Sequence, residues 1–298
     1  MEFIKPLLGP LRAPFLLLTP ACVLAGMGAA AWRSGRLDPL QVALAMAGAV
    51  LAHIAVNSLN EFHDFKSGLD SRTKRTPFSG GSGTLQEHPE LAGWALAAGL
   101  GSAAVVAAIG LFFVRERGPL LLLPGLAGLA VILAYTPLLT KNPLACLLAP
   151  GLGFGTCMVM GTEYALSGCF SWTGFSASLV PFFLVSDLLL LNQFPDVKAD
   201  RKAGRSHLLI VHGMKAGAAV YGLFLLGAYL SIAAGVALRF LPPLALLGLL
   251  TIPFSVAAAR GAWKYRSNIR RLTPFMGMNV LINLLTPVLL AVGLFLSR

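Results

Sequence analysis

The stretch LQVALAMAGAVLAHIAVNSLNEFHDFKSGLD, residues 40–70, joins a long apolar run directly to a polar motif. The first twenty or so residues are apolar enough to lie inside a membrane, and a helix of about 20 residues crosses a hydrocarbon core of about 30 Å. The last eleven residues hold an amide, three carboxylates, a histidine and a lysine. The stretch therefore predicts a transmembrane helix that ends in a functional polar motif.

The composition of the whole chain extends this prediction. Of 298 residues, 56% are hydrophobic and 12% are charged, whereas soluble domains carry about 25% charged residues. The mean hydropathy is +0.77, which indicates an integral membrane protein. The apolar runs are continuous, so helices are favoured over alternating strands. The net charge of +11 comes without a basic patch interleaved with aromatic residues, which favours membrane topology and an anionic ligand over nucleic acid.

The pattern predicts an all-α membrane protein in which residues 1–298 form one bundle of about nine transmembrane helices. No linker divides the chain, and the first apolar segment is longer than the core of a signal peptide, so we expect it to be retained. The predicted helices cover residues 12–32, 40–62, 91–114, 119–136, 143–165, 173–194, 214–238, 241–260 and 274–296.

The distribution of Lys and Arg predicts the orientation. With nine spans, 17 of the 23 cationic residues fall on one side and 6 on the other, and the richer side of a membrane protein is cytoplasmic. We therefore expect a multi-pass protein of the inner or plasma membrane with its N-terminus in the cytoplasm. The loops 63–90, 195–213 and 261–273 fall on the cytoplasmic side, where they would cap an active site.

A polar stripe follows the second predicted helix. His53, Asn57, Asn60 and Asp64 are spaced by three or four residues, which places them within about 60° of one another at 100° per residue. The stripe continues to Glu61 and Asp70 at the cytoplasmic mouth.

A second acidic motif, NQFPDVKAD, ends the sixth predicted helix. Asn192, Asp196 and Asp200 repeat every four residues, although Pro195 can distort the turn. Solvated helix ends are the alternative explanation for one such motif. Two motifs on the same side, each with an Asn one turn before an Asp and with basic residues after it, favour a binding site.

Grouped carboxylates need a neutralising partner. Lys or Arg could serve, but Mg²⁺ explains more, because it binds one or two carboxylates, waters and substrate phosphates. Two such ions would leave room for a diphosphate between the motifs. Basic residues that could hold its other oxygens follow each motif, namely Lys66, Arg72, Lys74 and Arg75, and then Lys198, Arg201, Lys202 and Arg205. The glycine-rich TPFSGGSGTL, residues 76–85, could cradle phosphate or could be a flexible turn.

These paired motifs resemble those of the UbiA superfamily of intramembrane prenyltransferases, N-D-x-x-D-x-x-x-D and N-x-x-x-D-x-x-x-D. The resemblance covers nearly the whole chain and implies the same helical fold. It implies that Mg²⁺ and a prenyl diphosphate are bound by Asn60, Glu61, Asp64, Asp70, Asn192, Asp196 and Asp200. Two departures stand out, because Glu61 replaces the usual Asp and Gln193 stands where some members have another acid. In addition, Asp70 lies six rather than four residues after Asp64.

The first motif looks more like the 1,4-dihydroxy-2-naphthoate branch, of menaquinone type, than the 4-hydroxybenzoate branch. The resemblance then implies a mechanism. A prenyl diphosphate enters from the lipid, Mg²⁺ and basic residues stabilise the departing diphosphate, and an electron-rich aromatic ring attacks the allylic cation. Asp64 and Asp196 would be central to this chemistry.

Other polar residues are weaker candidates. Tyr135 could face the allylic cation or could be an interfacial tyrosine, and Lys141 and Arg12 could contact phosphate or anchor the topology. His53 could contact the acceptor or accept its proton, or could be a hydrogen-bonded core histidine. Asn57 could support the diphosphate site. Asp187 lies deep in the sixth helix and could pair with a neighbouring helix instead.

Three alternatives remain open at this point. The acceptor could be non-aromatic, such as a glycerol phosphate ether lipid, or it could be a haem or chlorophyll precursor, because the motifs bind only the donor. A transporter or channel lined by acids would belong to a different class. Its ionisable residues should follow a path through the bilayer, whereas here they gather at one face.

Overall fold

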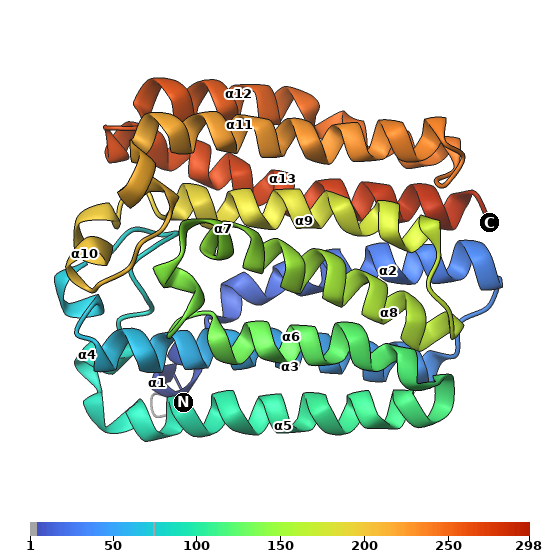
Figure 1. The fold of residues 1–298 in the computed structure, drawn as a ribbon, viewed down its shortest axis with the longest axis horizontal. Coiled ribbons are helices and arrows are strands. Elements are labelled where there is room, and N and C mark those ends of the chain that lie inside the picture. Colours follow the sequence, from blue (N-terminus) through green and yellow to red (C-terminus); the bar gives the residue numbers. More distant parts are fainter. Residues whose placement is uncertain (1–4, 74) are drawn as a thin grey trace.

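The computed structural model describes residues 5–73 and 75–298, which form helices joined by short connections (Figure 1). Within these residues no strand occurs, and a single isolated bridge pairs Thr76 with Ser79. Eight of the described helical segments are long and apolar enough to cross a membrane. They are Ala13–Ser34, Pro39–Lys66, Pro89–Arg117, Pro143–Ser167, Trp172–Asn192, Leu208–Ala237, Pro243–Tyr265 and Ile269–Leu296. The predicted all-α membrane fold is confirmed.

The remaining predicted span, 119–136, corresponds to a shorter apolar helix, Pro119–Ala134, whose α-helical part is α6 (Leu122–Ala134). At 1.5 Å per residue, α6 is about 20 Å long. This is less than the thickness of a hydrocarbon core of about 30 Å. The count of nine crossings therefore stays a prediction, and so does the side on which the N-terminus lies.

Several connections at the polar end of the bundle are shorter than predicted. Helix α3 (Pro39–Lys66) continues past the predicted start of the loop 63–90. The predicted loop 261–273 is wrong, because α12 (Ile252–Tyr265) and α13 (Ile269–Leu296) leave only 266–268 between them. Hydropathy marks only the part of a helix that lies in lipid, whereas a helix can continue into water, where its polar side chains are solvated.

The predicted loop 195–213 also contains helical residues. It holds α10 (Val197–Lys202) and the first residues of α11 (Leu208–Ala237). Helix α11 is interrupted at Gly213, whose φ of 81° and ψ of 166° are not helical. Glycine tolerates this positive φ at low cost, so the chain bends close to the boundary that was predicted at residue 214.

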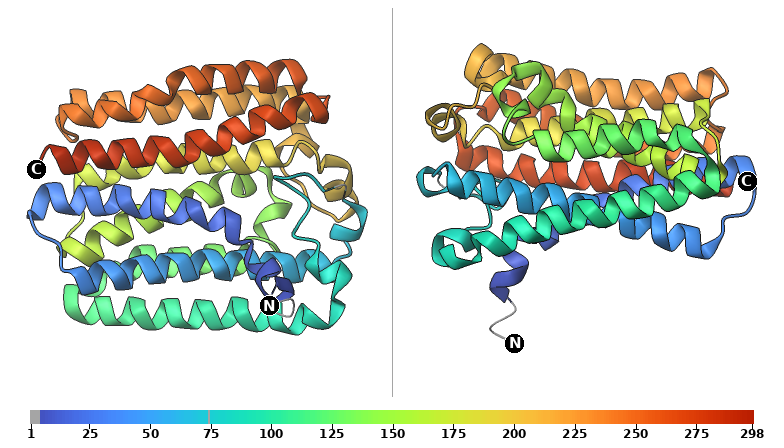
Figure 2. Two further views of the ribbon diagram at one scale, coloured as in Figure 1. Left: turned by 180° about the vertical axis from the view of Figure 1, so that it is seen from behind. Right: turned by 60° about the horizontal axis from the view of Figure 1, so that its bottom comes forward.

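The helices lie side by side, and the connections that follow both acidic motifs meet at one end of the bundle (Figures 1 and 2). In Figure 1, α5 (Ala92–Arg117), α6 and α3 form the lower part, and α11 and α12 form the upper part. The short helices α4 (Thr84–Glu87) and α10 both lie at the left end. The fold therefore brings two loops that are distant in the sequence to the same end of the bundle.

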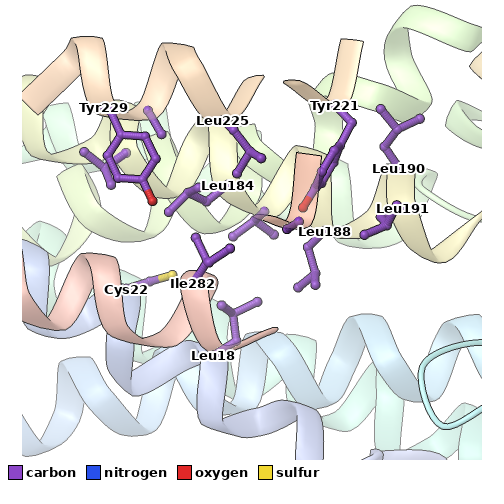
Figure 3. Packing of buried hydrophobic residues seen from close by; sticks show 14 of the residues in the cluster. Leu18, Cys22, Leu184, Leu188, Leu190, Leu191, Tyr221, Leu225, Tyr229 and Ile282 are labelled. Atoms are coloured by element: carbon purple, nitrogen blue, oxygen red, sulfur yellow. The ribbon is translucent and has the colours of Figure 1, made fainter. Parts of the chain in front are cut away.

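Helix α9 (Trp172–Asn192) is the centre of the core (Figure 3). Leu184 and Leu191 are fully buried, and they belong to one apolar cluster with Cys22 of α2 (Leu18–Ser34), Tyr221 of α11 and Ile282 of α13. In lipid, helices associate through close packing rather than through exclusion of water. Helix α9 is the most buried of the apolar spans, and α2, α11, α13 and the span Pro143–Ser167 pack against it.

Close backbone approach next to α9 depends on small residues. Helix α7 (Pro143–Gly151) continues through a π-helical turn, Leu152–Cys157, into α8 (Met158–Ser167). A Cβ at Gly151 would lie 2.1 Å from the carbonyl oxygen of Phe182, and a Cβ at Gly155 would lie 2.4 Å from its nitrogen. These glycines, four residues apart, let the backbones touch in the manner of small-residue helix interfaces. The π turn places Phe154 and Cys157 against the cavity described below.

Candidate functional site

A cavity of about 540 Å³ lies inside the bundle and receives side chains from both acidic motifs. Its polar lining comes from the N-terminal segment, the end of α3, the glycine-rich loop, and the chain on either side of α10. The sequence-predicted residues that line it are Arg12, His53, Asn57, Asn60, Asp64, Asp70, Tyr135, Asn192, Asp196, Asp200 and Arg205. The structure therefore brings together two motifs that are far apart in the sequence.

The rest of the cavity wall is apolar. Small residues of α3 from Ala45 to Val56 line it together with residues of α5, α6 and the π turn. Ala45 precedes Asp64 by nineteen residues on the same helix, a rise of about 28 Å. The cavity thus has a charged end and an apolar part that extends through most of the membrane thickness, a shape that suits an amphiphile with an anionic head and a long hydrocarbon tail.

Arg205 joins the two motifs at the charged end. Its guanidinium donates to Asp64 of α3 and, through Nη1, to Oδ1 of Asp200 at 3.0 Å. The other oxygen of Asp200 lies 3.0 Å from Nε2 of His207. The segment that carries Arg205 and His207 is fixed in turn, because the Ser206 backbone N–H donates to the Thr140 carbonyl oxygen at 2.9 Å. Two buried carboxylates therefore share one cation.

Three other oxygens at the charged end point into buried space without a hydrogen-bond partner among the described residues. They are Oδ2 of Asp70, Oδ1 of Asn192 and Oδ1 of Asp196. Buried polar groups are normally satisfied, and unpaired carboxylate and amide oxygens are the donors that a hard cation prefers. The residues present thus fit a divalent ion that is also bound by substrate oxygens and water.

Two carboxyl groups in these loops have pKa values above the ordinary value for aspartate. Burial raises the pKa of Asp196 to about 7, with a further contribution from the neighbouring Asp200. Burial also raises the pKa of Asp70 to about 6, and the charges of Asp64 and Glu61 add to the effect. Within residues 5–73 and 75–298, no three His, Cys, Asp or Glu side chains form a preassembled metal site.

Hydrogen bonds from their amide nitrogens fix the side chains of two asparagines near the end of α3. Asn57 Nδ2 donates to the Leu11 carbonyl oxygen at 3.0 Å, and Asn60 Nδ2 donates to Thr136 Oγ1 at 3.1 Å. Each amide is thereby oriented, and its carbonyl oxygen accepts no hydrogen bond from the described residues. Because both residues line the cavity, these oxygens are available to a ligand.

Glu61 is placed differently from its neighbours in the motif. Its side chain is fully buried and lies outside the cavity lining. Its carboxylate accepts hydrogen bonds from Arg12 Nε at 2.6 Å and from the backbone N–H and hydroxyl of Ser82 at 2.7 and 2.9 Å. The structure therefore does not bring Glu61 together with the acids that face the cavity.

Most of the predicted basic residues lie at the surface. Among the described members of that set, only Arg12 and Arg205 line the cavity, whereas Lys66, Arg72, Arg75, Lys141 and Lys202 are exposed outside it. Arg75 donates to Gln86 at 3.0 Å and pairs with Glu87 at 3.7 Å. Lys74 lies outside the described residues. Local sequence spacing could not separate these cases, because the path of a loop decides which side chains turn inwards.

Tyr135 and His53 both line the cavity, but at different depths. Tyr135 follows the end of α6, and its hydroxyl lies 4.0 Å from Cys146 Sγ. His53 precedes Asp64 by eleven residues, about 16 Å along the helix, and its Nδ1 lies 2.8 Å from Thr19 Oγ1. Its ring packs edge-on against Phe154. Tyr135 is thus close to the charged end, whereas His53 lies beside the apolar part.

Asp187 does not line the cavity. Its side chain is fully buried in α9, and the nearby polar groups are Asn279 and Asn283 of α13. Polar side chains between membrane helices often hold those helices together.

Sequence reasoning missed His207, which lines the cavity, is 1% exposed and contacts Asp200. The sequence feature that could have identified His207 is its position, two residues after Arg205 in the loop that follows the second motif.

The sequence of the chain is similar to one family model and to several known enzymes. The family model described as the UbiA prenyltransferase family matches residues 19–285. The 1,4-dihydroxy-2-naphthoate octaprenyltransferase of Bacillus subtilis (strain 168) is 26% identical over 211 residues, which cover 70% of this chain and 66% of that enzyme. The enzyme of the same name from Escherichia coli (strain K12) is 27% identical and covers 97% of this chain and 94% of its own length.

A solved structure has the same fold. It is a UbiA homolog from Archaeoglobus fulgidus bound to GPP and Mg²⁺, with a TM-score of 0.62 and 13% identity. The superposition covers 97% of this chain and 99% of that one. At this level of identity the likeness concerns the fold alone.

Proposed function

The chain belongs to the UbiA prenyltransferase family and is an enzyme of that class, and we propose that it transfers a prenyl group from a polyprenyl diphosphate to an aromatic quinone precursor in a Mg²⁺-dependent reaction. The observation that carries this proposal is the single cavity that joins both acidic motifs to a long apolar wall. The diphosphate would lie at the charged end, and the prenyl tail would extend along α3.

We propose 1,4-dihydroxy-2-naphthoate as the acceptor. This assignment is supported by the activity for which the two relatives at 26% and 27% identity are named and by the form of the first motif. The distribution of Lys and Arg supports an active site that faces the cytoplasm. Because the acceptor is a small polar aromatic acid, it would reach the charged end of the cavity from water, while the donor enters from the lipid.

Asp64, Asp70, Asp196 and Asp200, with the amide oxygens of Asn60 and Asn192, would hold Mg²⁺. When bound, the ion would supply positive charge to the diphosphate oxygens. Support comes from the unpartnered oxygens of Asp70, Asn192 and Asp196 and from the Mg²⁺ bound by the Archaeoglobus homolog. We leave Glu61 out of this set, because Arg12 and Ser82 already occupy its carboxylate.

The residues of the chain then act on the donor and on the developing cation. The C–O bond between the allylic carbon and the diphosphate breaks, and the guanidinium groups of Arg12 and Arg205 stabilise the charge on the leaving diphosphate. The π face of Tyr135 can stabilise the allylic cation. A ring carbon of the acceptor forms the new C–C bond, and the ring releases one proton. The apolar wall excludes water, which would otherwise capture the cation.

The test is product formation by the purified protein in nanodiscs with a polyprenyl diphosphate and Mg²⁺. The acceptors compared are 1,4-dihydroxy-2-naphthoate, 4-hydroxybenzoate, a glycerol phosphate ether lipid and a haem. We expect the naphthoate to give the prenylated product and EDTA to abolish it. A product only with a non-aromatic acceptor would refute the acceptor assignment. Activity that EDTA does not affect would refute the metal–diphosphate mechanism, and flux in proteoliposomes without covalent product would favour a transporter.

A further inference from the structure

Glu61 occupies an acidic position of the first motif, yet its carboxylate is already saturated. Oε1 accepts from Arg12 Nε at 2.6 Å and from the Ser82 backbone N–H at 2.7 Å, and Oε2 accepts from the Ser82 hydroxyl at 2.9 Å. The side chain is 0% exposed and does not line the cavity. Because both carboxylate oxygens already accept hydrogen bonds, Glu61 cannot also bind a metal ion without losing some of these contacts.

The three contacts of Glu61 tie together three separate segments. Arg12 lies 49 residues before it and has a left-handed backbone conformation with φ of 52°, which non-glycine residues rarely adopt. Ser82 lies 21 residues after it, between Gly81 and Gly83, whose φ values are 71° and 81°. Such glycines leave a loop conformationally free unless something fixes it. Glu61 supplies that fixed point on the rigid helix α3.

What Glu61 fixes belongs to the charged end of the cavity. Arg12 lines the cavity, and so do Gly80 and Gly81 of the glycine-rich loop. A Cβ added at Gly81 would lie 3.0 Å from both carboxylate oxygens of Asp70. The loop is therefore packed directly on one of the acids proposed to hold the cation, and a shift of Ser82 would move it.

We propose that Glu61 is a positioning residue rather than a metal ligand: it fastens Arg12 and the glycine-rich loop to α3, and so presents the Arg12 guanidinium and the Gly80–Gly81 backbone to the diphosphate. This inference rests on the proposed prenyl-transfer function. It also accounts for the glutamate at a position where the family motif has aspartate. The extra methylene carries the carboxylate beyond the helix surface to Ser82.

The decisive comparison uses Glu61→Gln, Glu61→Asp and Asp64→Asn, with Mn²⁺ as the probe ion. Electron paramagnetic resonance with inorganic pyrophosphate counts the Mn²⁺ ions bound by each purified variant without any turnover. We expect both Glu61 variants to bind as many Mn²⁺ ions as the unmodified protein and Asp64→Asn to bind fewer. Loss of Mn²⁺ from Glu61→Gln to the level of Asp64→Asn would overturn the proposal.

Steady-state kinetics give an independent readout. For both Glu61 variants, the KM for the prenyl diphosphate should rise about tenfold, while the KM for the acceptor stays within twofold. Glu61→Asp should behave like Glu61→Gln, because the shorter side chain cannot reach Ser82. Full activity of Glu61→Asp would show that any carboxylate suffices there, and it would overturn the positioning role. The matched control is Glu87→Gln, since Glu87 has an exposed side chain and pairs only with Arg75 at 3.7 Å among the described residues.

Limited trypsin digestion tests the loop directly. Arg75 is exposed at the start of the glycine-rich loop, so release of the loop should speed cleavage after it. Ser82→Ala removes one of the three hydrogen bonds to Glu61, together with the hydrogen bond that the Thr84 N–H donates to the Ser82 hydroxyl at 3.1 Å. It should show intermediate cleavage, even if Glu61→Gln folds poorly. Cleavage at the unmodified rate in Ser82→Ala and Glu61→Gln would overturn the role as a fastener. If neither the unmodified protein nor any variant forms product, while the Mn²⁺ and cleavage results hold, the proposed function fails, but the fastening of Arg12 and the glycine-rich loop to α3 by Glu61 stands.

Discussion

The guanidinium of Arg205 donates to Asp64, a residue 141 positions earlier in the chain. This contact connects the loop after the second motif to the helix that carries the first motif. Because Arg205 also binds Asp200 at 3.0 Å, one protein cation pairs with a carboxylate from each motif. Arg205 is thus the residue that holds the two halves of the site together.

Replacement of Arg205 by Gln should destabilise the metal-free protein. Removal of one partner from a buried ion pair costs about 3–5 kcal/mol, because the remaining charge is left unpaired, and here two acids lose their cation. We expect a lower melting temperature without Mg²⁺ and a larger stabilisation by Mg²⁺ with pyrophosphate than in the unmodified protein. Thermal unfolding in detergent measures both. The control is Arg201→Gln, an exposed arginine of the same segment. Equal stabilisation of Arg205→Gln and of the unmodified protein by Mg²⁺ with pyrophosphate would contradict the prediction.

Asp64→Asn and Asp196→Asn should each lower turnover at least tenfold while the protein still inserts and folds. Both side chains line the charged end, and an amide oxygen is a poorer ligand for Mg²⁺ than a carboxylate. Product formation under saturating substrates measures the effect, and size-exclusion chromatography checks the fold. Near-normal turnover in either variant would remove that residue from the proposed metal site.

The raised pKa values of Asp196, about 7, and Asp70, about 6, predict an opposite pH dependence for the metal-free and metal-bound protein. Both groups bind protons in the folded state above the ordinary value of 3.8. Unfolding therefore releases protons between pH 4 and 7. The free energy of unfolding without metal should fall as pH rises through this window, by at most about 1.4 kcal/mol per pH unit for each group.

Mg²⁺ competes with these protons, so its stabilising effect should increase from pH 5.5 to pH 8. Melting temperatures with and without Mg²⁺ and pyrophosphate at several pH values give both trends. In Asp196→Asn, the part of this pH dependence that comes from the carboxyl group with a pKa of about 7 should disappear. A Mg²⁺-induced shift that does not change with pH would show that these carboxyls do not bind the ion.

His207 should matter through Asp200 rather than through the substrate. Its Nε2 lies 3.0 Å from Oδ2 of Asp200, and a hydrogen bond that orients a metal-binding carboxylate typically contributes 10- to 100-fold in metal affinity. His207→Ala should weaken Mn²⁺ binding in the presence of pyrophosphate by about tenfold. His207→Gln, whose amide can donate from nearly the same place, should restore most of it. His212→Ala is the control, because His212 is exposed one turn further along the chain. If His207→Gln and His207→Ala weaken Mn²⁺ binding equally, the hydrogen bond to Asp200 is not the cause of the effect.

Sequence alone identified the helices and both motifs because the information for each is local. A segment in lipid must satisfy its own backbone hydrogen bonds, so hydropathy alone marks helices such as α9. The spacing of four residues between Asn192, Asp196 and Asp200 can be recognised in the sequence whatever surrounds these residues. The same locality explains the error at 261–273, where hydropathy ended before α12 did.

Only the tertiary structure decided which of these groups meet. Arg205 reaches Asp64 across 141 residues, whereas Lys66, although it follows the same motif, is exposed. Glu61 and Asp64 are one turn apart on α3, yet packing directs the first towards Ser82 and the second towards the cavity. Composition and periodicity determine that a helix spans the membrane and which residue types it carries. Contacts between distant segments determine where each side chain points, because that depends on how the whole bundle packs.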